Sequence, residues 1–246
     1  MDRVIARLRE FWDADAEVYD RTISHAGTDP AEAGAWRRAL LRSLPPPGAS
    51  VLDVGAGTGT ISVLAAQLGY RVTALDLSPR MLERAREKAK AAGVEIALVE
   101  SPADVPPAGP FDAVMERHVL WTVPDPIGAL RAWREVVVPG GRLALFETIF
   151  SDRPGQALRE AAAAGLRRMV GIPADHHAHY QADLLSNLPL ARITKPDSLG
   201  EAAAEAGWRR VRMARLRGVE RARLRASPPV IGRLEHAVRY ALIADA

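Results

Sequence analysis

The chain has 246 residues, of which 48% are hydrophobic and 26% charged, and its 33 basic and 30 acidic side chains give a net charge of +3. These values are typical of a globular protein with one sizeable core. The absence of cysteine excludes disulfides, a thiolate nucleophile and cysteine-based metal sites. The sequence has no run of 18 apolar residues, so no membrane span is predicted, and its charged start does not resemble a signal peptide. A cytoplasmic protein is therefore expected.

The first elements in chain order are helical. Apolar residues at helical spacing predict one or two amphipathic helices over 3–20 and another over 31–44, ended by the sequence PPPG. From residue 48 the pattern changes to buried strands alternating with helices. Five strands are expected in SVLDVGAG, YRVTALDLS, VEIALVES, FDAVMERH and RLALFETIF, with helices in TISVLAAQLG, PRMLERAREKAKAAG and PIGALRAWRE. Such alternation builds a parallel sheet with helices on both faces.

After residue 150 the pattern loosens. A helix is predicted over 154–171, an irregular stretch over 172–196 and a second helix over 197–207. The Arg-rich segment that follows alternates Val211 and Met213 with arginines, which predicts a strand over 208–216 with one solvated face. Because no aromatic residues are interleaved with these arginines, nucleic-acid binding is not expected. A short helix over 230–237 and a last strand over 238–245 complete the chain.

Three glycines, Gly55, Gly57 and Gly59, follow the first predicted strand in the sequence LDVGAGTG. In a doubly wound sheet this loop is where ligands bind. A phosphate-binding P-loop would need a lysine followed by a hydroxyl residue, and both are missing. A dinucleotide-binding loop would place its third glycine one position later, where Thr60 stands, which counts against a nicotinamide or flavin cofactor.

Two acidic residues flank this loop. Asp76 ends the second strand, about 20 residues downstream of the loop, where a carboxylate accepts hydrogen bonds from ribose hydroxyls. Asp53 precedes the glycines and is predicted to orient the loop and to meet a cationic or amino group. A ligand with a ribose, no phosphate and a cationic end fits this arrangement, and S-adenosylmethionine is such a ligand.

At this point the sequence resembles the class I S-adenosylmethionine-dependent methyltransferases, in particular the branch that acts on small molecules. The resemblance covers about residues 48–150 and is carried by VLDVGAGTG, VTALDLSPRMLERAREKA, FDAVMERHVLWTVPDP and LRAWREVVVPGGRLALFE. It implies an α/β fold with a doubly wound, mostly parallel seven-stranded sheet whose last strand is antiparallel. It also implies methyl transfer from S-adenosylmethionine to an O, N or C atom of a small molecule, with S-adenosylhomocysteine as product.

We expect a single domain over 1–246. Its parts are a helical cap over 1–47, a cofactor-binding core over 48–150, a helical lid over 151–200, and a closing helix and strand hairpin over 201–246. The oligomeric state is expected to be a monomer or a homodimer.

The resemblance also implies roles for individual residues around the cofactor. The glycine loop, with Ala56, would pack against the amino-acid part of the cofactor, and Leu77 and Met81 would flank the adenine. Glu116 and Arg117, after the fourth strand, would lie near the sulfonium.

The chain departs from the family after the third strand. Pro102 stands where a carboxylate is common in the family. Asp104, or the backbone of Ala103, is therefore predicted to read the adenine amino group.

Three further residues are candidates for contact with the reacting groups. His118 follows the fourth strand and is either a general base or a loop residue that shapes the pocket. Tyr19 lies in a segment that resembles the N-terminal helix of related methyltransferases, where a tyrosine touches the methionine end; the alternative is a half-buried core aromatic. Trp121 is predicted to form a wall of the substrate site.

The sequence DHHAHY is the densest polar cluster of the chain. Its residues His176, His177, His179 and Tyr180 are predicted to line the substrate side or to lie on the surface. Their spacing is not that of a helical zinc site and no carboxylate motif completes it, so no metal is expected.

Two other functions stay open at this stage. One is a homologue that binds the adenosyl ligand but senses it or catalyses another reaction, and the other is a dinucleotide-dependent oxidoreductase. An open, polar-lined cavity beside the sulfonium position would favour an enzyme over a sensor.

Overall fold

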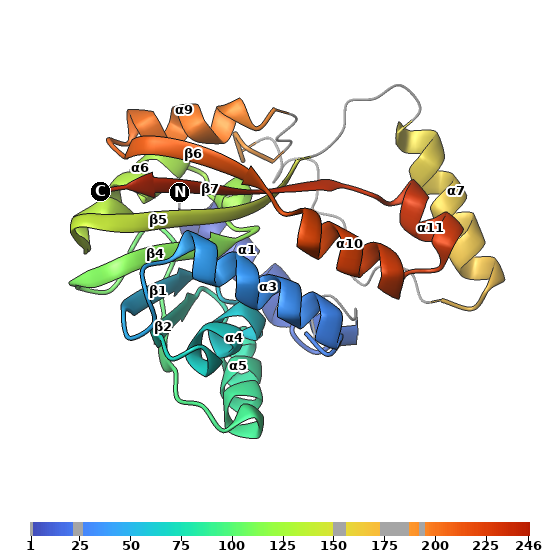
Figure 1. Cartoon of the computed structure of the whole chain (residues 1–246), viewed down its shortest axis with the longest axis horizontal. Coiled ribbons are helices and arrows are strands. Elements are labelled where there is room, and N and C mark those ends of the chain that lie inside the picture. The colour runs from blue at the N-terminus through green and yellow to red at the C-terminus, as the bar shows by residue number, and fades with distance from the viewer. Residues whose placement is uncertain (1, 22–26, 150–155, 173–186, 192–194) are drawn as a thin grey trace.

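The computed structural model describes residues 2–21, 27–149, 156–172, 187–191 and 195–246 (Figure 1). Its centre is a seven-stranded sheet in the order β3-β2-β1-β4-β5-β7-β6. The strands are β1 (Ser50–Val54), β2 (Arg71–Asp76), β3 (Ala97–Glu100), β4 (Phe111–Arg117), β5 (Val137–Ile149), β6 (Arg209–Arg215) and β7 (Val238–Asp245). Strands β1 to β5 pair in parallel, and β7 is antiparallel to both β5 and β6. The predicted fold class is confirmed.

The strand order reverses at β1, which pairs with β2 on one side and with β4 on the other. At such a reversal the connections leave on opposite faces of the sheet, and a crevice opens at the carboxyl ends of the strands. The glycine loop after β1 lies at this point.

Helices cover both faces of the sheet (Figure 1). They are α1 (Asp2–Asp15), α3 (Pro30–Ser43), α4 (Thr60–Gln67), α5 (Pro79–Ala92), α6 (Pro126–Glu135), α7 (Gln156–Met169), α9 (Asp197–Glu205), α10 (Arg217–Ala226) and α11 (Pro229–Leu234), with short 3-10 turns η1 (Tyr19–Arg21) and η2 (Leu120–Thr122). One core joins α3, α4 and α10 to the sheet, and a second joins α6 and α9 to the opposite face. The two cores hold the strand ends, and therefore the crevice, in place.

Helix α5 shows how local sequence sets an element next to that crevice. Its N-cap is Ser78, whose hydroxyl accepts a hydrogen bond from the Met81 backbone N–H at 3.1 Å, and Pro79 occupies the first turn. Gly93 ends the helix in the left-handed conformation, with φ of 66°. Serine, proline and glycine are the residues preferred at these three places, and the prediction for this helix is confirmed.

Two elements differ from the sequence prediction. Helix α10 was not predicted, because its four arginines continue an Arg-rich strand and hide a narrow buried stripe that includes Val219 and Ala222. Strand β5 begins at Val137 and not at Arg142, since the Pro139-Gly140-Gly141 segment runs on as strand. The predicted strand β6 is confirmed, with Val211 and Met213 half-buried at alternate positions.

Helices α7 and α11 contact each other at one end of the molecule (Figure 1). The Arg167 guanidinium joins them through two hydrogen bonds to the Glu235 carboxylate, at 2.5 and 2.6 Å. None of the helices in the described ranges is long and apolar enough to cross a membrane. The division of the chain into cap, core, lid and closing hairpin stays a prediction.

Candidate active site

A pocket lies at the carboxyl ends of β1, β2 and β4, with α1 across from them. The side facing the strand ends is formed by Gly55, Gly57, Leu75, Asp76, Leu77, Met81, Pro102, Ala103 and Asp104. The other residues that line it are Ile5, Leu8, Trp12, Tyr19, Arg117, His118, Val119, Thr122, Val123 and Pro124. Ten of the residues predicted from the sequence therefore meet in one cavity: Tyr19, Gly55, Gly57, Asp76, Leu77, Met81, Ala103, Asp104, Arg117 and His118.

Asp76 joins the glycine loop to the start of α5. One carboxylate oxygen accepts a hydrogen bond from the Gly57 backbone N–H at 2.7 Å, and the other accepts one from the Ser78 N–H at 2.8 Å. Burial raises the pKa of Asp76 to about 6, against the lowering effect of these two hydrogen bonds. Each carboxylate oxygen has a second lone pair, so Asp76 can still accept hydrogen bonds from a ligand in the pocket.

The three loop glycines have different roles. A Cβ added at Gly57 would meet no atom within 4 Å, so the position opens into the pocket. At Gly55 it would lie 2.2 Å from a methyl carbon of Val119, and at Gly59 2.7 Å from the Cβ of Ala85 on α5. Gly55 and Gly59 therefore allow close packing within the protein, and Gly55 also lines the pocket together with Gly57.

Asp53 and Ala56 lie behind the loop and do not line the pocket. The Ser62 hydroxyl donates to a carboxylate oxygen of Asp53 at 2.5 Å, and the Ala56 N–H donates to the Leu75 carbonyl at 2.9 Å. Burial raises the pKa of Asp53 to about 7. Asp53 is thus a buried residue behind the glycine loop, hydrogen-bonded to the first turn of α4.

One end of the pocket is mostly apolar. Leu77 and Met81 line it from the start of α5, and Pro102, Ala103 and Asp104 line it from the loop after β3. The Ala103 carbonyl accepts a hydrogen bond of 2.6 Å from the indole N–H of Trp133, a fully buried residue of α6. This bond fixes the backbone at a position predicted to read the adenine.

Helix α1 and the turn after it form the wall across from the strand ends. Ile5, Leu8 and Trp12 line the pocket from α1, and Tyr19 lies edge-on to Trp12 with 6.1 Å between the ring centroids. Neither Ile5 nor Leu8 was predicted from the sequence to line the site. The apolar face of α1 was visible in the sequence, but no local signal showed that it would cover this pocket.

His118 forms a polar edge of the pocket. Its backbone has φ of 62°, an uncommon conformation for a residue other than glycine, of the kind that concentrates at functional sites. Its Nδ1 lies 3.1 Å from a carboxylate oxygen of Glu147, and its Nε2 lies 3.3 Å from the Thr148 hydroxyl. Glu147 was missed from the sequence. The reason is that the β4–β5 register, in which Arg117 pairs with Phe146 and His118 and Glu147 follow them, is known only from the structure.

Glu116 lies beneath this edge and does not line the pocket. One of its carboxylate oxygens accepts a hydrogen bond from the Val119 N–H at 2.7 Å. Burial raises the pKa of Glu116 to about 8 and the pKa of Glu147 well above its ordinary value. Repulsion from Glu116 raises the pKa of Glu147 further. The other oxygen of each carboxyl has no hydrogen-bond partner among the described residues. With a pKa of about 8, Glu116 holds a proton at neutral pH, which removes its repulsion of Glu147.

The remaining predicted residues do not line this pocket or cannot be placed. Trp121 is half-buried and packs against the hydrophobic core on the α6 side. His176, His177, His179 and Tyr180 lie outside the described residues. Within the described ranges there is no group of three or more His, Asp or Glu side chains that could hold a metal ion.

Comparison with known proteins agrees with this geometry. The family model described as "Methyltransferase domain" matches residues 52–145. A ubiquinone biosynthesis O-methyltransferase of Xanthomonas campestris pv. campestris (strain B100) is 34% identical over 205 residues, covering 81% of this chain and 82% of the relative.

Solved structures share the fold. One is a geranyl diphosphate methyltransferase in complex with GPP and sinefungin, with a TM-score of 0.58, 17% identity and coverage of 86% of this chain and 78% of that one. Another is an N-methyltransferase of Haemonchus contortus in complex with phosphomonomethylethanolamine and S-adenosylhomocysteine, with a TM-score of 0.57, 17% identity and coverage of 85% and 52%.

Fold and pocket together define a doubly wound α/β protein with a ligand site where the strand order reverses. The chain belongs to the class I S-adenosylmethionine-dependent methyltransferases. It is an enzyme of methyl transfer.

Proposed function

We propose that this pocket binds S-adenosylmethionine and that the enzyme methylates a hydroxyl oxygen of a small-molecule acceptor, with His118 as general base. The observation that carries the proposal is the position of His118, on the pocket wall and bonded to Glu147. The choice of oxygen over nitrogen or carbon is supported by the Xanthomonas relative, which is named as an O-methyltransferase.

The residues present fit the donor. Gly57 leaves open the space that a side chain would fill, and Asp76 beside it offers lone pairs to the ribose hydroxyls. Leu77 and Met81 give the adenine apolar neighbours. Arg117, whose guanidinium lies 5.6 Å from the centre of the Trp36 ring, is the cationic group for the methionine carboxylate.

When bound, S-adenosylmethionine supplies an electrophilic methyl group. The chain's own part is alignment, exclusion of water and acceptance of a proton. With Nδ1–H donating to Glu147, Nε2 of His118 is the basic nitrogen. As the acceptor oxygen gains the methyl group, its proton passes to Nε2, and Glu147 stabilises the imidazolium that forms. The acceptor hydroxyl takes the place of the Thr148 contact at Nε2.

The acceptor side of the pocket has mostly apolar walls, which come from Val119, Thr122, Val123 and Pro124. The roles of Trp121, His176, His177, His179 and Tyr180 in acceptor binding stay predictions. So do the cytoplasmic location and the monomeric or homodimeric state.

The proposal is tested by a product assay. The purified enzyme is incubated with S-adenosylmethionine and with matched compounds that carry either a hydroxyl or an amine on the same aromatic or aliphatic frame. We expect S-adenosylhomocysteine together with the methyl ether, at a rate that drops in His118→Ala. Methylation of the amines alone would contradict the role of a hydroxyl acceptor, and oxidation of the compounds with NAD would contradict methyl transfer altogether.

A further inference from the structure

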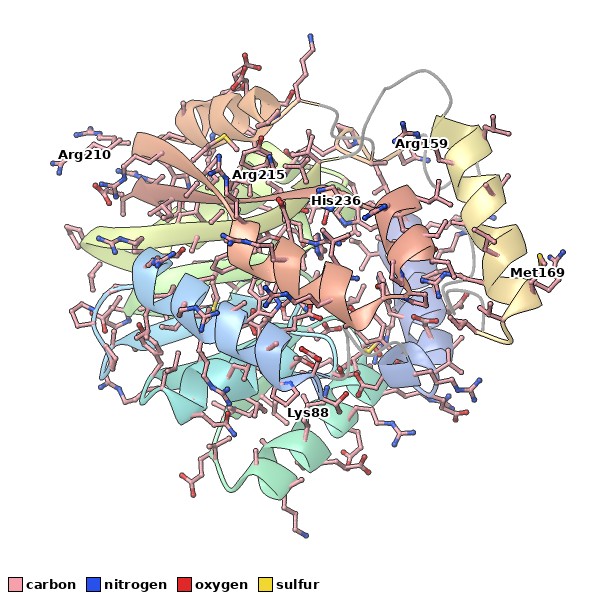
Figure 2. The ribbon with its side chains drawn as sticks, turned by 45° about the vertical axis from the view of Figure 1, so that its right-hand side comes forward. Lys88, Arg159, Met169, Arg210, Arg215 and His236 are labelled. Atoms are coloured by element: carbon pink, nitrogen blue, oxygen red, sulfur yellow. The ribbon has the colours of Figure 1, made fainter. Side chains whose placement is uncertain are left out.

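Lys88, labelled in Figure 2, lies on the third turn of α5, and its ammonium group is largely buried, with 21% of the side chain exposed. It contacts three oxygen atoms. These are the Asp20 carboxylate at 3.1 Å, the Thr58 hydroxyl at 3.0 Å and the Thr60 hydroxyl at 2.6 Å. An ammonium group that leaves water needs this full set of acceptors, because a buried charge without hydrogen-bond partners destabilises the folded state.

The cluster joins three segments that are distant in the sequence. Asp20 belongs to the turn after α1, 68 residues from Lys88, and Thr58 belongs to the glycine loop, 30 residues away. The Thr58 hydroxyl also donates to Asp20 at 2.8 Å, so the loop and the turn contact each other directly. Thr58 and Thr60 are nearly fully buried.

The contacts at Asp20 and Thr58 each lie one residue away from the pocket wall. Tyr19, next to Asp20, lines the pocket from the N-terminal side, and Gly57, next to Thr58, lines it from the strand side. A second contact holds the same segment, since the Ser78 hydroxyl donates to Asp13 of α1 at 2.5 Å. The N-terminal wall is therefore bonded to α5 at two points, and the ionic one is at Lys88.

We propose that Lys88 is a positioning residue of the donor pocket, which holds Tyr19 and Gly57 in place on opposite walls before the donor binds. The inference rests on the proposed function, because the pocket it completes is the donor site. Without the ammonium group, the Asp20 carboxylate has no cation beside it, and among the described residues the turn that carries Tyr19 is joined to the loop by the Thr58 hydrogen bond alone. The pocket must then be assembled when the donor binds, which costs affinity.

The first test is hydrogen exchange on the ligand-free protein, which does not depend on donor binding. In Lys88→Met we expect faster exchange of the backbone amides in residues 12–21 than in the wild type. Lys90→Met is the matched control, since Lys90 lies on the exposed side of the same helix, and it should exchange as the wild type does. Unchanged exchange in Lys88→Met would overturn the proposal.

The second test is calorimetric titration with S-adenosylhomocysteine. We expect Lys88→Met to weaken binding by roughly 10-fold, the equivalent of one charge-assisted contact, and Lys90→Met to bind as the wild type does. A variant that unfolds at a lower temperature but keeps wild-type affinity would show a merely structural role and would contradict the proposal.

Asp20→Asn keeps the size of the side chain and removes its charge, so it provides a second variant if Lys88→Met does not fold. Alone it should weaken binding by a similar factor. In the double variant with Lys88→Met the two effects should not multiply, because both remove the same contact. Multiplying effects would contradict a shared role. A wild type that does not bind S-adenosylhomocysteine would overturn the proposed function, while the exchange experiment would still decide the role of Lys88.

Discussion

The two walls of the pocket are built in different ways. The wall at the strand ends is set by short-range contacts, such as the hydrogen bond from Gly57 to Asp76, 19 residues apart, and the cap of Ser78 on α5. The wall formed by α1 and Tyr19 is attached by side chains 65 and 68 residues apart, in the Asp13–Ser78 and Asp20–Lys88 contacts. The proposed donor contacts thus come from local motifs, whereas the wall that would enclose the donor depends on contacts between distant segments.

The edge of the pocket at His118, proposed as catalytic, is also built by a contact between distant segments. His118 meets Glu147 across two neighbouring strands, 29 residues apart. If this division is correct, substitutions at the strand-end wall change the affinity for the donor, and substitutions at the His118 edge change kcat. Calorimetry and steady-state kinetics then distinguish the two effects.

The largest effect is expected for His118→Ala. Loss of a general base lowers kcat by about 10²- to 10⁴-fold, while the affinity for S-adenosylhomocysteine stays within about twofold of the wild type. The wild type loses activity at low pH, because a protonated imidazole accepts no proton, and this acidic limb disappears in the variant. Steady-state rates over pH and calorimetry measure both properties. A parallel loss of donor affinity would place His118 in donor binding instead.

The next largest effect is a difference in kcat between variants of the two buried carboxyls, Glu147 and Glu116. Glu147→Gln should lower kcat by roughly 10- to 100-fold, because the carboxylate that fixes the His118 tautomer is lost. Glu116→Gln should change kcat little at pH 7, since burial raises the pKa of Glu116 to about 8 and the amide replaces a carboxyl that is already neutral. Equal losses in the two variants would show that His118 does not depend on Glu147 in particular.

A smaller effect separates two glycines of the same loop. Gly59→Ala places a methyl group 2.7 Å from Ala85 and should lower the free energy of unfolding by about 1–3 kcal/mol. Both positions have a positive φ that disfavours alanine, but Gly57→Ala meets no protein atom within 4 Å, so it should lose less stability than Gly59→Ala. It should bind S-adenosylhomocysteine at least about 10-fold more weakly, because the methyl group occupies the pocket. Urea unfolding and calorimetry on both variants make the comparison. The reverse pattern would mean that Gly59, and not Gly57, faces the ligand.

The last effect is the dependence of stability on pH, and it concerns Asp53. Because its pKa is raised to about 7 in the folded protein, the folded state binds the proton more tightly than the unfolded state does. Its contribution to stability is therefore present at pH 4 and is lost as the pH rises to about 7, on the order of 4 kcal/mol at most. The free energy of unfolding, measured with urea between pH 4.5 and 8, should therefore depend less steeply on pH in Asp53→Asn than in the wild type.

Asp112 is the control of opposite sign. Hydrogen bonds from the Ser50 N–H and hydroxyl lower its pKa, so its contribution is lost as the pH falls. As the pH falls, the free energy of unfolding should therefore decrease less in Asp112→Asn than in the wild type. If Asp53→Asn leaves the slope between pH 4.5 and 8 unchanged, Asp53 is not held in its protonated form.

Much of the strand-end wall could be predicted from the sequence, since each part has a local signal. Buried runs marked the strands, and serine, proline and glycine marked the ends of α5. The spacing between the glycine loop and Asp76 placed both at one crevice.

What could not be predicted depends on which segments meet. The packing of Gly59 on Ala85 becomes visible only when α5 lies against the loop. Likewise, no local pattern connects Asp20 with Lys88. Helix α10 was missed because arginines dominate both it and the preceding strand, so the change of period from two to 3.6 is carried by very few apolar residues.

The most direct test of the central claim is calorimetric titration of S-adenosylhomocysteine into the wild type and Asp76→Ala. We predict one site with a Kd in the micromolar range for the wild type, and affinity at least about 10-fold weaker for the variant, because hydrogen bonds to a carboxylate are lost together with the anchor of Gly57. Equal affinity in the two proteins, or a wild type that binds NADH tightly and S-adenosylhomocysteine not at all, would contradict the account.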